Sequence, residues 1–116
     1  MSPRLPMIAL TLILSGGAAH AFTGKCVLQV DGKTYLNGPC PIGLEQGGDF
    51  SIGTDGTDTT KPSKYFAMVS IDKDTGTGDG WWNGVDADSH AHDPLGKLTR
   101  QGACWVNARA KVCAMK

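Results

Sequence analysis

The chain has 116 residues, with 11 basic and 11 acidic side chains, so its formal net charge is zero. This balance leaves no strongly basic surface, which argues against nucleic acid or an anionic membrane as the main partner. The length suits one domain rather than two.

The first 21 residues have the three zones of an export signal. Arg4 provides a positive charge, an apolar run follows over 7–14, and Ala19-His20-Ala21 offers the small-x-small pattern of a cleavage site. The apolar run is far shorter than the ~20 residues that a membrane-spanning helix requires. We therefore expect 1–21 to be a signal peptide and 22–116 to form one domain without a membrane span, located in the periplasm or secreted.

All four cysteines follow the leader, at positions Cys26, Cys40, Cys104 and Cys113. In a small exported domain they are most simply interpreted as two disulfides formed in an oxidising compartment. Three pairings are possible. Geometry favours the local one, Cys26 with Cys40 and Cys104 with Cys113, because a four-residue hairpin loop over 107–110 would place Cys104 directly opposite Cys113.

The composition favours strands and turns, and the first hairpin is clear. Ten of the eleven acids are aspartate, and glycine is abundant. Asp31-Gly32 suits a two-residue hairpin turn, which predicts Leu28 opposite Tyr35 and Val27 opposite Leu36.

The middle of the chain is richer in turns. Residues 49–52 predict a short strand, 53–62 a polar loop, and 95–100 a further strand. Residues 65–71 are apolar on nearly both faces, which predicts a strand buried on both sides. Residues 85–91 have room for one or two helical turns. We expect an all-β domain, or a mainly β one with a short helical turn: a small antiparallel sheet, barrel or sandwich of five to seven strands, stapled by disulfides.

Trp81, Trp82 and Asn83 suggest a binding surface. Adjacent strand residues point to opposite faces, so one indole would enter the core while the other could stack on a sugar or fill a partner's pocket. The alternative, which we favour, is that both rings join Trp105 in a core that has few other large residues.

The segment 86–93 contains the densest group of side chains that could bind a metal ion. Asp86, Asp88, His90 and His92 combine carboxylates with imidazoles, the donors that suit zinc, copper or nickel. If the segment coils, Asp86 would neighbour His90 and Asp88 would neighbour His92. We favour a solvated loop, because the spacing matches no established ligand signature.

No catalytic constellation stands out. Ser89 adjoins His90, but adjacency in sequence is not triad geometry, and no nucleophile elbow surrounds it. With all cysteines able to pair, we expect a protein that is not an enzyme and has no cofactor.

Four stretches carry a resemblance to small exported proteobacterial proteins of unassigned function: 65–69, Trp82-Asn83-Gly84, 89–92 with Leu95-Gly96, and 102–107 with 112–114. The resemblance implies that these elements belong to one compact unit and implies no activity.

Two function classes stay open. One is an exported binding module for a protein or glycan, such as an inhibitor or an envelope-interaction protein, that presents Trp81, Trp82, Asn83, His90 and His92. The other is a metal-binding protein.

Overall fold

The structure, a computed structural model, describes residues 20–57 and 61–116. All but the last two residues of the predicted signal peptide lie outside this part of the chain. The described residues form eight strands: β1 (His20–Val30), β2 (Lys33–Leu44), β3 (Phe50–Ile52), β4 (Ala67–Asp72), β5 (Thr77–Trp82), β6 (Asp93–Gln101), β7 (Cys104–Val106) and β8 (Ala110–Met115).

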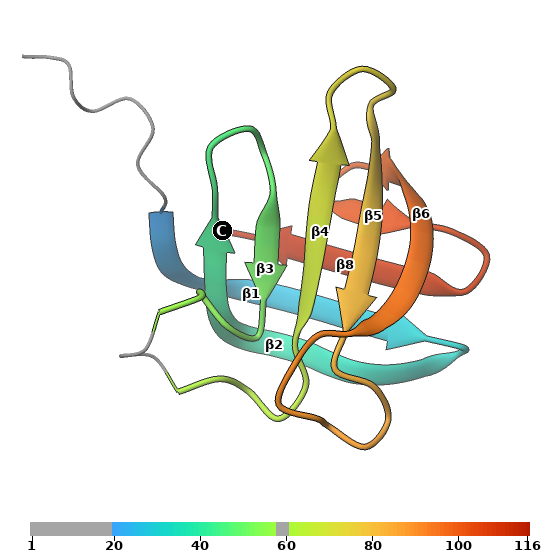
Figure 1. Cartoon of the computed structure of the whole chain (residues 1–116). Helices are drawn as coiled ribbons and strands as arrows, with labels where there is room; N and C mark the ends of the chain where they lie inside the picture. The colour runs from blue at the N-terminus through green and yellow to red at the C-terminus, as the bar shows by residue number, and fades with distance from the viewer. Residues whose placement is uncertain (1–19, 58–60) are drawn as a thin grey trace, which may run out of the picture.

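The strands close into an antiparallel barrel (Figure 1). Each strand pairs with the next along the chain, and β8 returns to pair with β1 from Lys25 opposite Met115 to Val30 opposite Ala110. The predicted all-β antiparallel fold is confirmed, although eight strands exceed the five to seven expected. No helix within the described residues is long and apolar enough to cross a membrane.

The segment 85–91 is a loop, so the helical turn predicted there is wrong. Gly84 has φ 79° and Ala87 has φ 54°, both in the left-handed region. A right-handed helical turn cannot pass through such residues.

One hydrophobic core lies inside the barrel, because alternate residues of each strand point inward. In β1 the inward set is Cys26, Leu28 and Val30, each at most 1% exposed. In β4 the alternation corrects our expectation of burial on both faces. Val69 is buried, but its neighbour Met68 is 41% exposed on the outer surface.

The first hairpin turns at Asp31 (φ 51°) and Gly32 (φ 82°), as predicted, and its pairing then shifts by one residue. A bulge at Tyr35 places Leu28 opposite Leu36 rather than Tyr35, and Val27 opposite Asn37 rather than Leu36. The bulge turns Tyr35 toward two other rings. Its ring centroid lies 4.9 Å from that of Tyr65 and 4.7 Å from that of Trp82. The irregular pairing of β1 with β2 at Tyr35 therefore coincides with contact between its ring and the other two.

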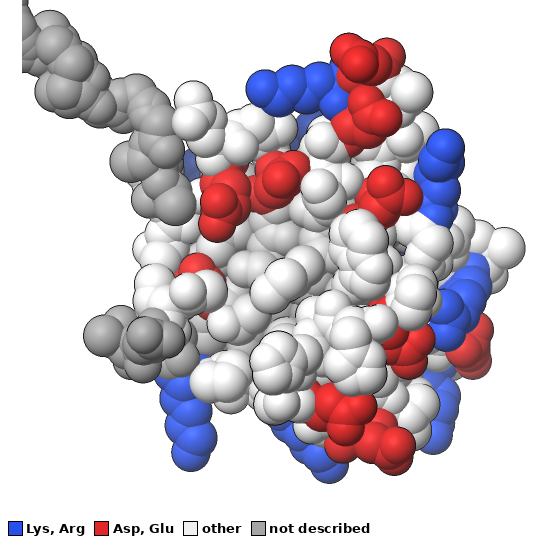
Figure 2. All heavy atoms as spheres, viewed as in Figure 1, with Lys and Arg blue, Asp and Glu red and all other residues white. Residues whose placement is uncertain are grey.

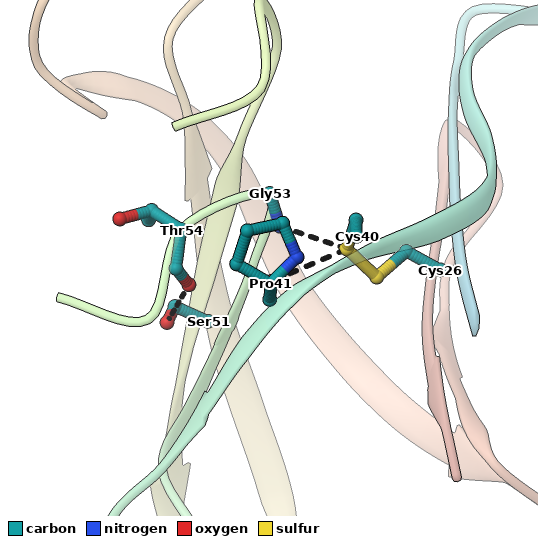
Figure 3. The surroundings of a disulfide bond; sticks show 6 residues. All are labelled: Cys26, Cys40, Pro41, Ser51, Gly53 and Thr54. Carbon is teal, nitrogen blue, oxygen red and sulfur yellow. Dashed lines mark hydrogen bonds between the residues drawn. A yellow bond between two sulfur atoms is a disulfide. The ribbon is translucent and has the colours of Figure 1, made fainter. Parts of the chain in front are cut away.

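Both predicted disulfides are present, Cys26 with Cys40 and Cys104 with Cys113, and the second joins directly opposed residues as expected. Figure 3 shows the first bond beside the turn that follows β3, where the N–H of Gly53 donates to Cys40 Sγ at 3.1 Å and to the carbonyl of Pro41 at 2.9 Å. Gly53 has φ 82°, and a β-carbon there would press on the Tyr65 carbonyl and on Phe66. Only glycine fits this position without strain.

The two ends of the barrel differ. At one end the rings of Tyr35, Tyr65 and Trp82 pack together, with centroid distances of 4.9, 4.7 and 6.2 Å. The other end lies beside the β2–β3 loop and the β4–β5 turn, toward the top of Figure 1, and has no comparable aromatic cluster among the described residues.

Candidate binding site

Trp81 and Trp82 project to opposite faces of β5. Trp82 is 1% exposed and lies in the core, whereas Trp81 is half-buried on the outer surface of the barrel. The favoured interpretation, in which both rings join Trp105 in the core, is therefore wrong for Trp81. Trp82 has no surface to offer a partner.

Asn83 is fully buried and has a structural role. Its Oδ1 accepts a hydrogen bond from the Phe66 N–H at 2.9 Å, and its Nδ2 donates to the carbonyls of Lys64 at 2.9 Å and Asp88 at 3.0 Å. One amide thus ties β5 to the segment before β4 and to the loop 83–92. Direct contact with a ligand is excluded by its burial.

The predicted metal ligands stay in an exposed loop. Asp88 Oδ2 lies 3.1 Å from His92 Nε2, as expected for residues four apart. His90 instead has its Nδ1 2.9 Å from the Ser89 hydroxyl, and within the described residues it forms no ion pair with Asp86. No group of three or more His, Cys, Asp or Glu side chains comes together in the part of the chain that the structure describes. Two groups are fewer than the three protein ligands typical of a catalytic zinc site.

The outer face of β3, β4 and β5 carries a hollow of about 260 Å³ beside Trp81. Strand register builds its floor, because Ser51 pairs with Met68 and Met68 pairs with Trp81. These three outward side chains form a row across the sheet. The indole and the thioether give the row an apolar surface on the outside of the sheet.

Acidic residues rim this hollow, which we call the Trp81 hollow. Among the described residues, its charged lining consists of Glu45, Asp49 and Asp55 and includes no lysine or arginine. In Figure 2 the same face is uncharged at its centre and has acidic side chains beside it, while most basic side chains lie toward the periphery.

Local structure fixes two of the three acids. Asp49 Oδ1 accepts a hydrogen bond from the Ile71 N–H at 2.7 Å, which joins the β2–β3 loop to the end of β4. Asp55 is held because the chain after β3 folds back onto Gly43, where a β-carbon would lie 2.7 Å from the Asp55 carbonyl oxygen. The Ser51 hydroxyl supports this bend by donating to the Thr54 carbonyl at 2.6 Å.

Sequence reasoning named Trp81 but missed the residues that surround it. Met68 was placed in a strand buried on both faces, Asp49 in the short strand 49–52 and Asp55 in the polar loop 53–62, and none of the acids was given a function. The feature that could have identified the site is the pairing of Met68 with Trp81 on the outer face of the sheet. This pairing can be recognised only once the register of β4 and β5 is known.

No family model matches the chain, and comparison with curated proteins and with solved structures gives no match.

Proposed function

We propose that this protein is an exported, non-enzymatic binding module that holds a protein partner by accommodating one of its arginine or lysine side chains in the Trp81 hollow. The observation that carries the proposal is the composition of the lining. An indole and a thioether supply the apolar surface, and every charged side chain among the lining residues that the structure describes is an acid.

The chemistry suits a long basic side chain better than other ligands. Its aliphatic stem packs on Met68 and Trp81, and its cation lies over the indole face within reach of the carboxylates. Such cation–π contacts are worth about 0.5–2 kcal/mol. A neutral glycan would also stack on Trp81, but it would gain nothing from the charge of three acids. The charge of the rim therefore favours a cationic group over a neutral sugar.

The cross-links and the predicted leader support the proposed location. Two disulfides fit an oxidising compartment, and the export signal predicted over 1–21 supports the periplasm or the exterior as the place of action. An inhibitor of another protein and an envelope-interaction protein are the two roles that such a module would fill.

The test combines capture with positional evidence. A photo-crosslinking residue at Ser70, which is exposed and lines the Trp81 hollow, should trap the partner from envelope extract. The same residue at the exposed Thr34, on the first hairpin, should not. Trp81→Ala should weaken capture about tenfold or more, since indoles at the centre of interfaces contribute 2 kcal/mol or more.

Matched variants separate the parts of the site. Val85→Ala truncates an apolar side chain that is 62% exposed outside the hollow, and it should leave capture unchanged. Asp49→Asn keeps an acceptor for the Ile71 N–H while removing the charge, and it should weaken capture, whereas Asp79→Asn outside the hollow should not. Equal crosslinking from Ser70 and Thr34, or unchanged capture by Trp81→Ala, contradicts the proposal.

A further inference from the structure

The end of the barrel away from the aromatic cluster contains a second cavity, of about 650 Å³, which we call the barrel mouth. Its volume lies within the range of ~300–1,000 Å³ that is typical of small-molecule sites, and barrel mouths are among their preferred locations. The wall is made of large apolar side chains from five different strands: Phe22, Ile42, Phe50, Ile71 and Trp105.

Small residues border the opening of the barrel mouth. The lining includes Gly47, Gly48 and Gly76 from the two neighbouring loops, and Gly102 and Ala103 from the β6–β7 turn. Leu44, 39% exposed, adds apolar surface at the edge. A slender apolar chain therefore has a route from solvent to the indole of Trp105, which is itself 8% exposed.

Two cations lie at the same opening. Lys73 belongs to the β4–β5 turn and Arg100 to the end of β6, and within the described residues neither forms an ion pair. Arg100 Nε donates to the Gly102 carbonyl at 3.1 Å, which anchors its guanidinium at the rim. The acid of the lining, Asp72, uses its Oδ1 to accept from the Asp74 N–H at 2.9 Å within the turn. Lys116 adds a third basic side chain.

From this arrangement we infer a second binding site, distinct from the Trp81 hollow, for a free amphipathic anion with a single acyl chain and a carboxylate head. The acyl chain lies against Ile42, Ile71 and Trp105. The carboxylate lies between Lys73 and Arg100, where a guanidinium can bind it with two parallel hydrogen bonds. An apolar wall alone would bind any hydrophobic molecule of suitable size. The two cations make the site selective for an anionic one.

The full chain, expressed with its leader and purified in oxidised form, is titrated with dodecanoate below its micelle concentration while the tryptophan indole N–H resonances are followed by NMR. The Trp105 resonance should shift and saturate, and that of Trp81, outside the barrel, should stay in place. Affinity should rise about fourfold for each methylene added between octanoate and dodecanoate, the increment expected for a buried CH₂.

Two variants test the site without disturbing the core. The double substitution Lys73→Gln with Arg100→Gln should weaken dodecanoate binding about tenfold and leave dodecanol binding unchanged, and Lys97→Gln, at an exposed position outside the lining, is the matched control. Ala103→Trp at the exposed rim should obstruct the opening of the barrel mouth and abolish binding of both dodecanoate and dodecanol.

Three results would overturn the inference. The first is a shift of the Trp81 indole resonance in place of the Trp105 resonance. The second is a double variant that binds dodecanoate as tightly as the unsubstituted protein does. The third is co-sedimentation of the protein with phosphatidylglycerol vesicles that Ala103→Trp abolishes. The last result would identify a membrane surface, rather than a free carboxylate, as the ligand.

Discussion

Replacing Asn83 by alanine tests how the loop 83–92 is held to the barrel. The side chain is fully buried and makes three hydrogen bonds, to the Phe66 N–H and to the carbonyls of Lys64 and Asp88. The substitution removes all three and leaves the buried Phe66 N–H without an acceptor.

The magnitude follows from the burial of each partner. An unpaired buried donor costs about 1–3 kcal/mol, and each of the two part-buried carbonyls loses about 0.5–1.5 kcal/mol because water can replace part of the bond. The free energy of unfolding should therefore fall by about 2–6 kcal/mol. For a domain of this size the melting temperature should fall by ~10 °C or more.

Urea and thermal unfolding of the oxidised protein, followed by tryptophan fluorescence, measure the change. Asn37→Ala is the matched control, because Asn37 is exposed on β2 and its amide makes no side-chain hydrogen bond within the described residues; its unfolding free energy should change by no more than ~0.5 kcal/mol. A loss below ~1 kcal/mol for Asn83→Ala would refute the assigned hydrogen bonds.

Three further substitutions probe the scaffold. Replacing Cys104 and Cys113 together by alanine should lower the unfolding free energy by about 2–3 kcal/mol, as chain entropy predicts for so short a loop, and equal denaturation midpoints for the two proteins would contradict this. Gly53→Ala should cost about 2 kcal/mol or more, because its φ of 82° and the Tyr65 carbonyl leave no place for a methyl group; calorimetry showing an unchanged melting temperature would be incompatible with the observed turn. Arg109→Ala removes an exposed ion pair of 3.1 Å to Asp31 and a hydrogen bond of 2.8 Å from Nη1 to the Pro94 carbonyl, and should cost at most ~2 kcal/mol, so a larger loss in urea unfolding would indicate a role that the structure does not show.

The parts of the fold that depend on neighbouring residues were predictable from sequence. A loop over 107–110 sets the register of the last hairpin, so Cys104 and Cys113 were correctly placed opposite each other. The first hairpin turned where Asp31-Gly32 indicated, but its register depended on Tyr35, which bulges toward rings far away in the chain. Local reasoning has no access to such contacts.

The candidate site shows the same limit. Strand alternation allowed Trp81 and Trp82 to face opposite ways, but we favoured both rings in the core, because which residues of β5 face inward depends on the closure of the barrel. The acids of the Trp81 hollow come together because the chain after β3 lies on Gly43 and because Asp49 bonds to the end of β4. Neither contact leaves a pattern in the sequence.

The most direct test of recognition at the Trp81 hollow is an NMR titration of the three indole N–H resonances with a short glycine-flanked arginine peptide. The Trp81 resonance should shift, those of the buried Trp82 and Trp105 should not, and the shift should shrink as salt is raised. A Trp81 resonance that stays in place, or one that responds equally to the same peptide with glutamate in place of arginine, would contradict binding of a basic side chain at this surface.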